Sequence, residues 1–231
     1  MKRELVVLWI AVNQVDPSQF IITRKRKKYK FAKFANAQNC FEFDEWRQRD
    51  ERERAHIDVV EIGAGTGLFV VELAARHPGR RFVAVDVKAD RLQKGAYAAL
   101  ERGLDNVYFV RARADQAEEL FAPGSLSAIW LTFSDPFPKP RSAGRRMTHP
   151  TFLRRYAVLL GEGGFLRIKH DNLDFFQWSL EQLVTGRWRI DELTFDLHES
   201  ELADEYKILT TYEQRWLEEG RNTYLASARK L

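Results

Sequence analysis

The sequence contains a single cysteine, Cys40, among its 231 residues. One cysteine excludes a disulfide bond within the chain, and the absence of CxxC spacing or of a Cys/His cluster excludes the usual zinc sites. The five histidines also lack the spacing of a metal site or of a catalytic triad. We therefore expect a cytoplasmic protein that holds no metal.

Long apolar runs are lacking as well. A membrane span needs about 20 apolar residues, and the apolar run at residues 5–12 is far shorter. Glu4 interrupts the basic stretch before this run, and no small-residue cleavage site follows, so we expect neither a signal peptide nor a membrane partner. Residues 1–20 match no pattern, and an added strand, a flexible tail or an over-long start remain open.

The excess of positive charge is small, with 37 basic against 33 acidic residues, but it is concentrated. Residues 24–33 hold seven cations and no acid, and residues 139–155 hold six more, again without an acid. Two acid-free blocks on an otherwise acidic chain suit a surface that binds a polyanion. The alternative is a disordered tail together with a solvated loop.

Strand-like and helix-like patterns alternate along the chain. Short apolar runs typical of strands occur at residues 57–62, 81–86, 107–111, 127–132 and 164–170, with helical patterns between them. Residues 161–164 are expected to close the helix before the fifth run, and the remaining chain suggests a helix, a strand, a short helix and a final strand. This order predicts an α/β fold with a mostly parallel sheet that helices cover on both faces.

A glycine-rich loop follows the first predicted strand. It places four residues at the strand-to-helix turn, where such sheets bind ligands: Glu61, Gly63, Gly65 and Gly67. A dinucleotide fingerprint would need a glycine where the sequence has Leu68. Asp86, at the end of the second strand, fits an acid that binds ribose hydroxyls. Asp115, after the third strand, suits either the adenine end of a cofactor or a helix N-cap.

The segment at residues 134–146, SDPFPKPRSAGRR, contains three prolines and can be neither a central strand nor an ordinary helix. Its one carboxylate, Asp135, follows the fourth strand and therefore lies at the ligand-binding edge of the sheet. Four cations follow it: Lys139, Arg141, Arg145 and Arg146. They are expected to bind phosphates.

These motifs resemble a known family. E-x-G-x-G-x-G resembles the first motif of class I S-adenosylmethionine-dependent methyltransferases. The proline-rich segment resembles the Pro-Asp-Pro-Trp, Lys and Arg pattern of the tRNA (guanine-N7)-methyltransferase family, with Ser134, Phe137 and Ser142 as departures. GGFLRIKHD, which ends in Asp171, resembles a further motif of that family. TTYEQRWLEEG resembles its Thr-x-aromatic-Glu element, here Thr210, Thr211, Tyr212 and Glu213.

The resemblance implies a class I (Rossmann-like) methyltransferase fold in residues 51–231, with a seven-stranded, mostly parallel sheet that has one antiparallel strand. Residues 1–50 would form an extension that carries a basic RNA-binding segment. The implied activity transfers the methyl group of S-adenosyl-L-methionine to N7 of a guanine in the variable loop of tRNA and releases S-adenosyl-L-homocysteine. The implied partner is tRNA, and the protein is expected to be a monomer or homodimer.

The resemblance also implies roles for the residues. Asp135 is the expected catalytic residue. The cofactor would bind Glu61, Gly63, Gly65, Gly67, Asp86, Asp115 and Asp135. The substrate would bind Lys139, Arg141, Arg145, Arg146, Asp171, Thr210, Thr211, Tyr212 and Glu213.

Two other functions stay open. A class I methyltransferase acting on an exocyclic amine of a nucleobase is expected to have a second proline after Asp-Pro. A basic RNA-binding relic without activity has no reason to retain six acids near strand ends: Glu61, Asp86, Asp115, Asp135, Asp171 and Glu213.

Overall fold

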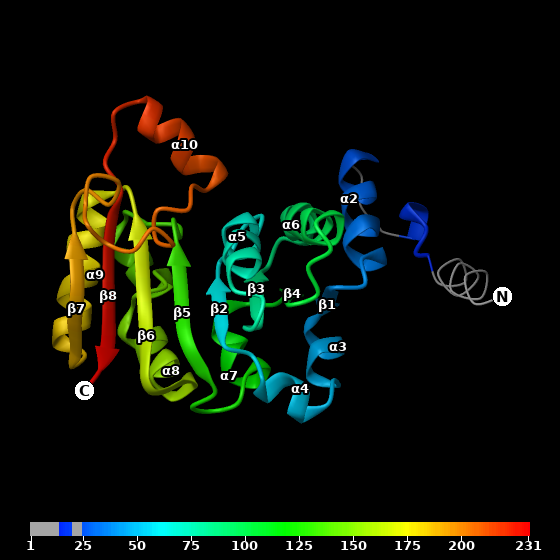
Figure 1. Cartoon of the computed structure of the whole chain (residues 1–231), viewed down its shortest axis with the longest axis horizontal. Helices are drawn as coiled ribbons and strands as arrows, with labels where there is room; N and C mark the ends of the chain where they lie inside the picture. The colour runs from blue at the N-terminus through cyan, green and yellow to red at the C-terminus, as the bar shows by residue number, and fades with distance from the viewer. Residues whose placement is uncertain (1–13, 20–24) are drawn as a thin grey trace.

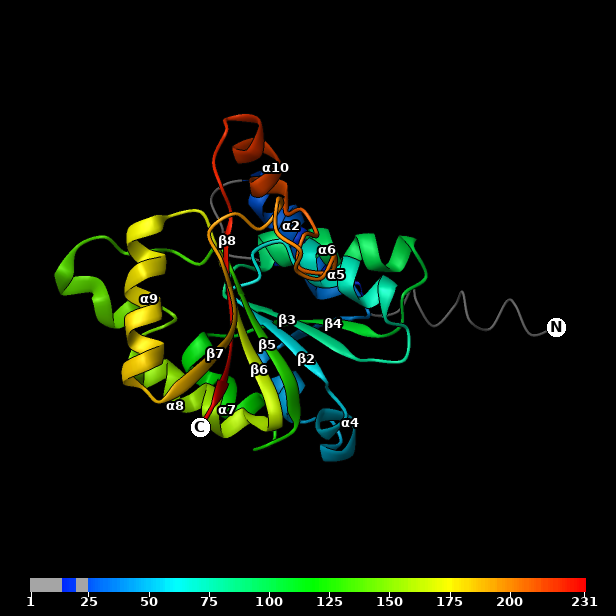
Figure 2. The ribbon, with the colours of Figure 1, turned by 60° about the vertical axis from the view of Figure 1, so that its left-hand side comes forward.

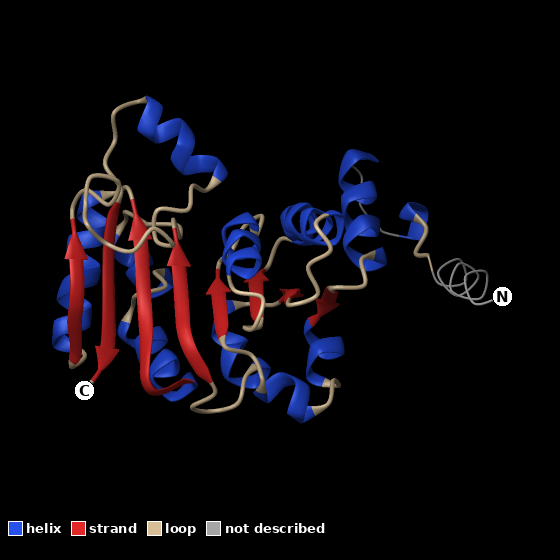
Figure 3. Ribbon diagram, in the orientation of Figure 1, coloured by secondary structure: helices blue, strands red, loops and turns tan. Residues whose placement is uncertain are grey.

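The computed structural model describes residues 14–19 and 25–231. Its described strands form one eight-stranded sheet in the order β1-β4-β3-β2-β5-β6-β8-β7 (Figures 1 and 3). The strands are β1 (Cys40–Glu42), β2 (Val59–Ile62), β3 (Phe82–Asp86), β4 (Val107–Arg111), β5 (Leu126–Thr132), β6 (Leu160–His170), β7 (Trp188–Thr194) and β8 (Tyr224–Lys230). β8 runs antiparallel to both of its neighbours, and the other described pairs are parallel.

The predicted α/β fold, a mostly parallel sheet with one antiparallel strand, is confirmed, but the sheet has eight strands and not seven. The additional strand is β1, which pairs with β4 at the edge of the sheet. Three residues are too few to show the alternating pattern by which a strand is recognised in a sequence. A second prediction was wrong: residues 161–164 lie within β6 and do not close the preceding helix.

Helices cover both faces of the sheet (Figure 2). They are α2 (Lys25–Asn36), α3 (Phe43–Arg47), α4 (Glu51–Ala55), α5 (Leu68–Arg76), α6 (Ala89–Glu101), α7 (Ala117–Leu120), α8 (Pro150–Leu159), α9 (Leu173–Thr185) and α10 (Thr211–Glu218), with 3₁₀ turns η1 (Pro17–Gln19), η2 (Ala114–Gln116) and η3 (Pro140–Arg145). None of the helices within the described ranges is long and apolar enough to cross a membrane.

The core has two halves, one on each face of the sheet, because neighbouring residues of a strand point to opposite faces. In β2, Val60 and Ile62 pack with side chains of α7, α8 and α9. Val59 packs on the other face with side chains of α2, α5 and α6. Glu61 shares the parity of Val59 and is also buried. The strand therefore carries a carboxylate into the interior just before the glycine loop.

The described part of the basic N-terminal block is helical. Lys25–Asn36 forms α2, which packs on α6 through buried Phe34. After β1, the indole Nε1 of Trp46 donates a hydrogen bond to the carbonyl of Leu120, 3.1 Å away. Arg24, the apolar run at residues 5–12 and the other residues of 1–13 and 20–24 lie outside the described residues. The division at residue 50 stays a prediction.

Candidate active site

A pocket opens at the carboxyl ends of the central strands, where most of the predicted cofactor-binding residues lie. It is lined by Glu61, Gly63, Ala64, Gly65, Thr66, Leu68, Phe69, Asp86, Val87, Lys88, Arg91, Thr132, Phe133, Ser134, Asp135, Met147 and Thr210. These residues come from β2, β3, β5, the loops that follow them and the first turns of α5 and α6, except Thr210, which lies just before α10. The parallel strands bring the glycine loop and the proline-rich loop to one edge, as such sheets do at their ligand sites.

The glycine loop bends around the side chain of Asp86. Gly63, Gly65 and Gly67 all have positive φ, and a Cβ at Gly67 would lie 2.7 Å from the ring of Phe109. At Gly65, by contrast, no atom lies within 4 Å of the Cβ position, so the backbone is open to the pocket. The Gly65 N–H donates to Asp86 Oδ2 at 2.8 Å, and the Lys88 N–H donates to Oδ1 at 2.8 Å. Each oxygen keeps a lone pair for a ligand.

Glu61 is 1% exposed, at the inner end of the pocket. The hydroxyl of Thr132 donates to its Oε1, while Oε2 makes no hydrogen bond of good geometry with the described residues. Burial raises the pKa of Glu61 to about 8, although hydrogen bonds from Thr132 and from the Val70 backbone, and the charge of Lys169, lower it. This carboxyl group therefore has an oxygen that can make a further hydrogen bond beside the pocket.

Asp135 follows β5 and is exposed to solvent. The carbonyl of Ser134, just before it, accepts a hydrogen bond from His170 Nε2 at 2.9 Å. Phe133 and Phe137, on either side, have φ values of 48° and 40°. Non-glycine residues seldom adopt such values, and they persist only where surrounding contacts hold them.

A second cleft adjoins the pocket and shares Arg91, Phe133, Ser134 and Asp135 with it. It is lined by Arg91, Phe133, Ser134, Asp135, Pro136, His170, Asp171, Asn172 and Trp216. The rings of Phe133 and Trp216 lie 5.3 Å apart, and Asp171 is only 13% exposed. The cleft therefore combines two aromatic rings with two carboxylates, Asp135 and Asp171. Such a cleft suits a flat, polar, hydrogen-bond-donating ring.

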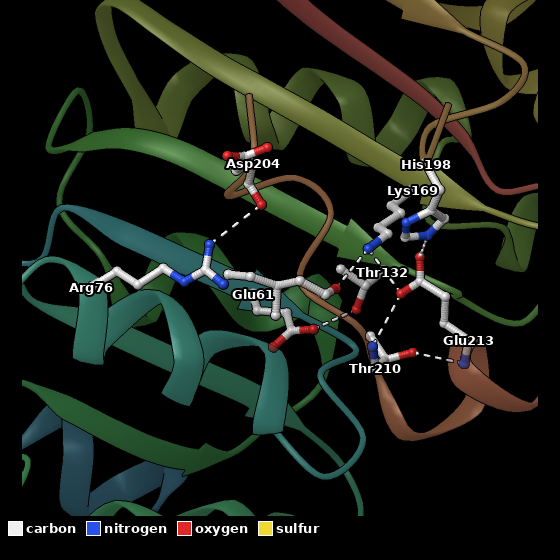
Figure 4. Close-up of polar contacts among 9 residues, drawn as sticks. Glu61, Arg76, Thr132, Lys169, His198, Asp204, Thr210 and Glu213 are labelled. Atoms are coloured by element: carbon white, nitrogen blue, oxygen red, sulfur yellow. Dashed lines mark hydrogen bonds and ion pairs between the residues drawn. The ribbon is translucent and has the colours of Figure 1, made fainter. Parts of the chain in front are cut away.

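Glu213 holds the start of α10 onto the sheet (Figure 4). Its Oε2 lies 2.8 Å from Lys169 Nζ and accepts a hydrogen bond from the Thr210 N–H at 3.0 Å. Its Oε1 lies 2.8 Å from His198 Nε2, and its own N–H donates to Thr210 Oγ1 at 3.1 Å. Glu213 and Lys169 have fully buried side chains. Glu213 therefore uses both oxygens within the protein, and Thr210 is the residue of this element that reaches the pocket.

The remaining predicted residues lie apart from the pocket. Asp115 pairs with Arg113 in η2 and is not among the pocket residues. Nor is it a helix N-cap, because Arg113 caps η2 and Gln116 caps α7. The cations Lys139, Arg141 and Arg145 are exposed on the loop. Thr211 and Tyr212 lie in α10, but their side chains are outside the described part of the chain.

Comparison with known proteins bears on this arrangement. A family model described as "Putative methyltransferase" matches residues 55–226. A tRNA (guanine-N(7)-)-methyltransferase of Brevibacillus brevis is 40% identical over 169 residues, which cover 73% of this chain and 78% of the relative. One of Bacteroides thetaiotaomicron is 34% identical over 212 residues, which cover 86% of this chain and 83% of the relative.

The chain belongs to the tRNA (guanine-N7-)-methyltransferase family. Solved structures with low sequence identity to this chain share its fold. The 16S rRNA methyltransferase KamB has a TM-score of 0.59 and 17% identity, over 77% of this chain and 90% of that one. The 16S rRNA (adenine(1408)-N(1))-methyltransferase of Catenulisporales acidiphilia has a TM-score of 0.57 and 15% identity, over 81% and 93%.

Sequence reasoning missed several residues at the site of this tRNA (guanine-N7-)-methyltransferase family member. Lys169 and His198 bind Glu213, and Thr132 binds Glu61. One signal could have been found: Thr210 and Glu213 have the Thr-x-x-Glu spacing of a capping box, in which each side chain binds the other residue's N–H. No local sequence pattern indicates the role of Lys169, because tertiary folding brings its partners to it.

Proposed function

We propose that this protein transfers the methyl group of S-adenosyl-L-methionine to N7 of a guanine in the variable loop of tRNA. The single observation that carries the proposal is the place of Asp135, which lines both the glycine-loop pocket and the adjoining aromatic cleft. A donor in the first site and a base in the second would meet at this carboxylate. Family membership at 40% identity supports the same activity.

The pocket residues fit S-adenosylmethionine. The space at Gly65 admits a ligand against the backbone, and the Asp86 carboxylate faces the same pocket with free lone pairs for ribose hydroxyls. Glu61 has an unused oxygen to accept a further hydrogen bond. When bound, the donor supplies an electrophilic methyl group on a positively charged sulfur. Asp115 would need to move to reach a ligand in this pocket, because it pairs with Arg113.

The chemistry requires little more than alignment. Guanine N7 carries an in-plane lone pair and no proton, so its attack needs no general base. Positioning two reactants in line contributes up to about 7 to 11 kcal/mol to lowering the barrier. Asp135 and Asp171 would accept hydrogen bonds from N1 and the amino group of guanine and stabilise the positive charge that develops on the purine. Phe133 and Trp216 would stack on the base.

The exposed cations extend the site toward RNA. Lys139, Arg141 and Arg145 lie on the loop that follows Asp135, in a position to bind the tRNA backbone near the target base. Lys27, Lys28 and Lys30 of α2 supply a second positive surface. That the protein acts in the cytoplasm, as a monomer or homodimer, stays a prediction.

The test is methylation of an unmodified tRNA transcript with labelled S-adenosylmethionine, followed by nucleoside analysis. We expect 7-methylguanosine, and a matched transcript with 7-deazaguanosine should accept no label because it lacks the N7 lone pair. Label in an N2-methylguanosine or N6-methyladenosine would support the exocyclic-amine alternative. Binding of tRNA without any methylation would support the RNA-binding relic.

A further inference from the structure

The first part of the loop after Asp135 has few backbone donors. Pro136, Pro138 and Pro140 have no N–H, so nearby carbonyls must find hydrogen-bond donors elsewhere. Arg146 provides them. Its Nε donates to the carbonyl of Pro136 at 3.0 Å, and its Nη2 donates to the carbonyl of Phe137 at 3.2 Å. One guanidinium therefore joins the two residues that directly follow Asp135.

The guanidinium of Arg146 is itself held in place by α9. Its Cζ lies 4.4 Å from the ring centroid of Trp178, which fixes the plane of the fork by cation–π contact. Two residues further on, Thr148 makes a 2.8 Å hydrogen bond to Ser179 of α9, and both side chains are fully buried. The end of the loop is therefore attached to a packed helix, and the hydrogen bonds of Arg146 link this end to the start of the loop.

Asp135 lies between two such attachments. On its N-terminal side, His170 binds the carbonyl of Ser134 at 2.9 Å. On its C-terminal side, Arg146 binds the carbonyls of Pro136 and Phe137. The strained φ of 40° at Phe137 requires contacts of this kind to persist.

The neighbouring arginine, Arg145, also lies over an aromatic ring but differs in exposure and in hydrogen bonding. Arg145 is exposed, and its guanidinium lies 4.3 Å from the ring centroid of Phe137. Within the described residues it donates no hydrogen bond to a carbonyl of the loop, so its donors remain available to a phosphate. Arg146 is partly buried, and its guanidinium donates to carbonyls of the loop. Two adjacent residues of the same type therefore offer an internal comparison.

We infer that Arg146 is a positioning residue, which holds Asp135 at the junction of the two clefts by binding the carbonyls of residues 136 and 137, and that it is not a phosphate contact. The inference revises the role that the sequence suggested for Arg146. It deepens the proposed function and rests on it, because the effect on turnover presupposes methyl transfer at Asp135.

The kinetic test uses Arg146→Lys, which retains the positive charge but loses the fork that binds two carbonyls. We expect kcat to fall about tenfold or more, with the KM for tRNA within about threefold of wild type and its salt dependence unchanged. The neighbouring variant Arg145→Ala should instead raise the KM for tRNA, more strongly at higher salt, and leave kcat near wild type. A normal kcat for Arg146→Lys, with a raised and more salt-dependent KM for Arg146→Ala, would make Arg146 a phosphate contact and overturn the inference.

A second test needs neither donor nor tRNA. Hydrogen exchange of the backbone amides at residues 139 and 141–145 should be at least about tenfold faster in Arg146→Lys and in Trp178→Leu than in wild type or in Arg145→Lys. Unchanged exchange in both variants would overturn the inference. If the wild-type protein failed to methylate tRNA but these exchange rates changed as expected, the proposed function would fail while the positioning role of Arg146 stood. Thermal unfolding would identify a variant that fails to fold. If one of the two variants fails, the other alone decides the exchange test.

Discussion

The ammonium of Lys169 lies 2.8 Å from the carboxylate of Glu213, and neither side chain is exposed. Lys169 belongs to β6 and Glu213 to α10, so this buried pair joins the sheet to the helix beside the pocket. Lys169 Nζ also donates to the carbonyl of Ile208 at 2.8 Å. Burial lowers the pKa of Lys169, and Glu213 opposes that change. The pair places Thr210 in the pocket wall.

Removal of one member of this pair should destabilise the protein strongly. Lys169→Met leaves the Glu213 carboxylate buried without its cation, and such a loss costs about 3 to 5 kcal/mol. The double variant Lys169→Met with Glu213→Leu removes both charges and should recover most of that loss. Urea denaturation of the three proteins measures the difference. Equal stability of wild type and Lys169→Met would show that the pair does not hold α10.

Titration of Glu61 should lower the free energy of unfolding as the pH rises. Its pKa of about 8 in the folded protein lies above the ordinary value of 4.5, so between these values the folded state keeps a proton that the unfolded state has lost. The free energy of unfolding contributed by this group therefore falls as pH rises from about 5 to about 8. Glu61→Gln cannot ionise and should flatten this slope in urea denaturation from pH 5.5 to 8.5. An unchanged slope would assign the pH dependence to other groups.

Asp135→Asn should reduce the rate of methyl transfer. The substitution keeps the size of the side chain but removes the charge that stabilises the developing positive purine, so we expect at least about a tenfold fall, or roughly 1.4 kcal/mol of barrier. Single-turnover kinetics at saturating tRNA measure the step itself, and tRNA binding should change little. A variant with the normal rate would leave Asp135 as a turn residue and direct attention to Asp171.

Asp86→Ala should weaken binding of the donor. Loss of charge-assisted hydrogen bonds to ribose hydroxyls costs about 1.5 to 3 kcal/mol, which corresponds to a tenfold or greater rise in Kd for S-adenosylhomocysteine by calorimetry. Asp115→Ala is the control, since Asp115 lies outside the pocket and pairs with Arg113. An equal loss in both variants would place Asp115 at the ligand. Binding of NAD in preference to the adenosyl compound would refute the assignment of the glycine loop.

The lysines of α2 should contribute to the salt dependence of tRNA binding. Deletion of the whole block would also remove most of α2, including the buried Ala32, so we choose Lys27→Gln, Lys28→Gln and Lys30→Gln together. Each phosphate contact that is lost reduces the slope of log K against log salt by about 0.7 to 0.9. Donor affinity should stay constant. Arg80→Gln with Arg81→Gln, just before β3 at the opposite end of the strands, is the control, and an equal effect there would exclude a specific role for α2.

The sequence determined the order of strands and helices and the edge at which the ligand residues gather. Local patterns were sufficient because alternating apolar strands, the glycine turn at Gly63–Gly67 and the prolines after Asp135 act over a few neighbouring residues. The strand β1 was missed because three residues carry too little pattern.

Tertiary structure decided which of the polar residues face a ligand and which bind one another. From the sequence alone, Glu213 could not be distinguished from Asp135, nor Arg146 from Arg145, because all four are charged residues in family motifs. Folding buries Glu213 against Lys169 and turns Arg146 toward the carbonyls of its own loop, while Asp135 and Arg145 stay exposed. The physical reason is that a charge withdrawn from water must find partners within the protein, and those partners come from strands and helices distant in the chain.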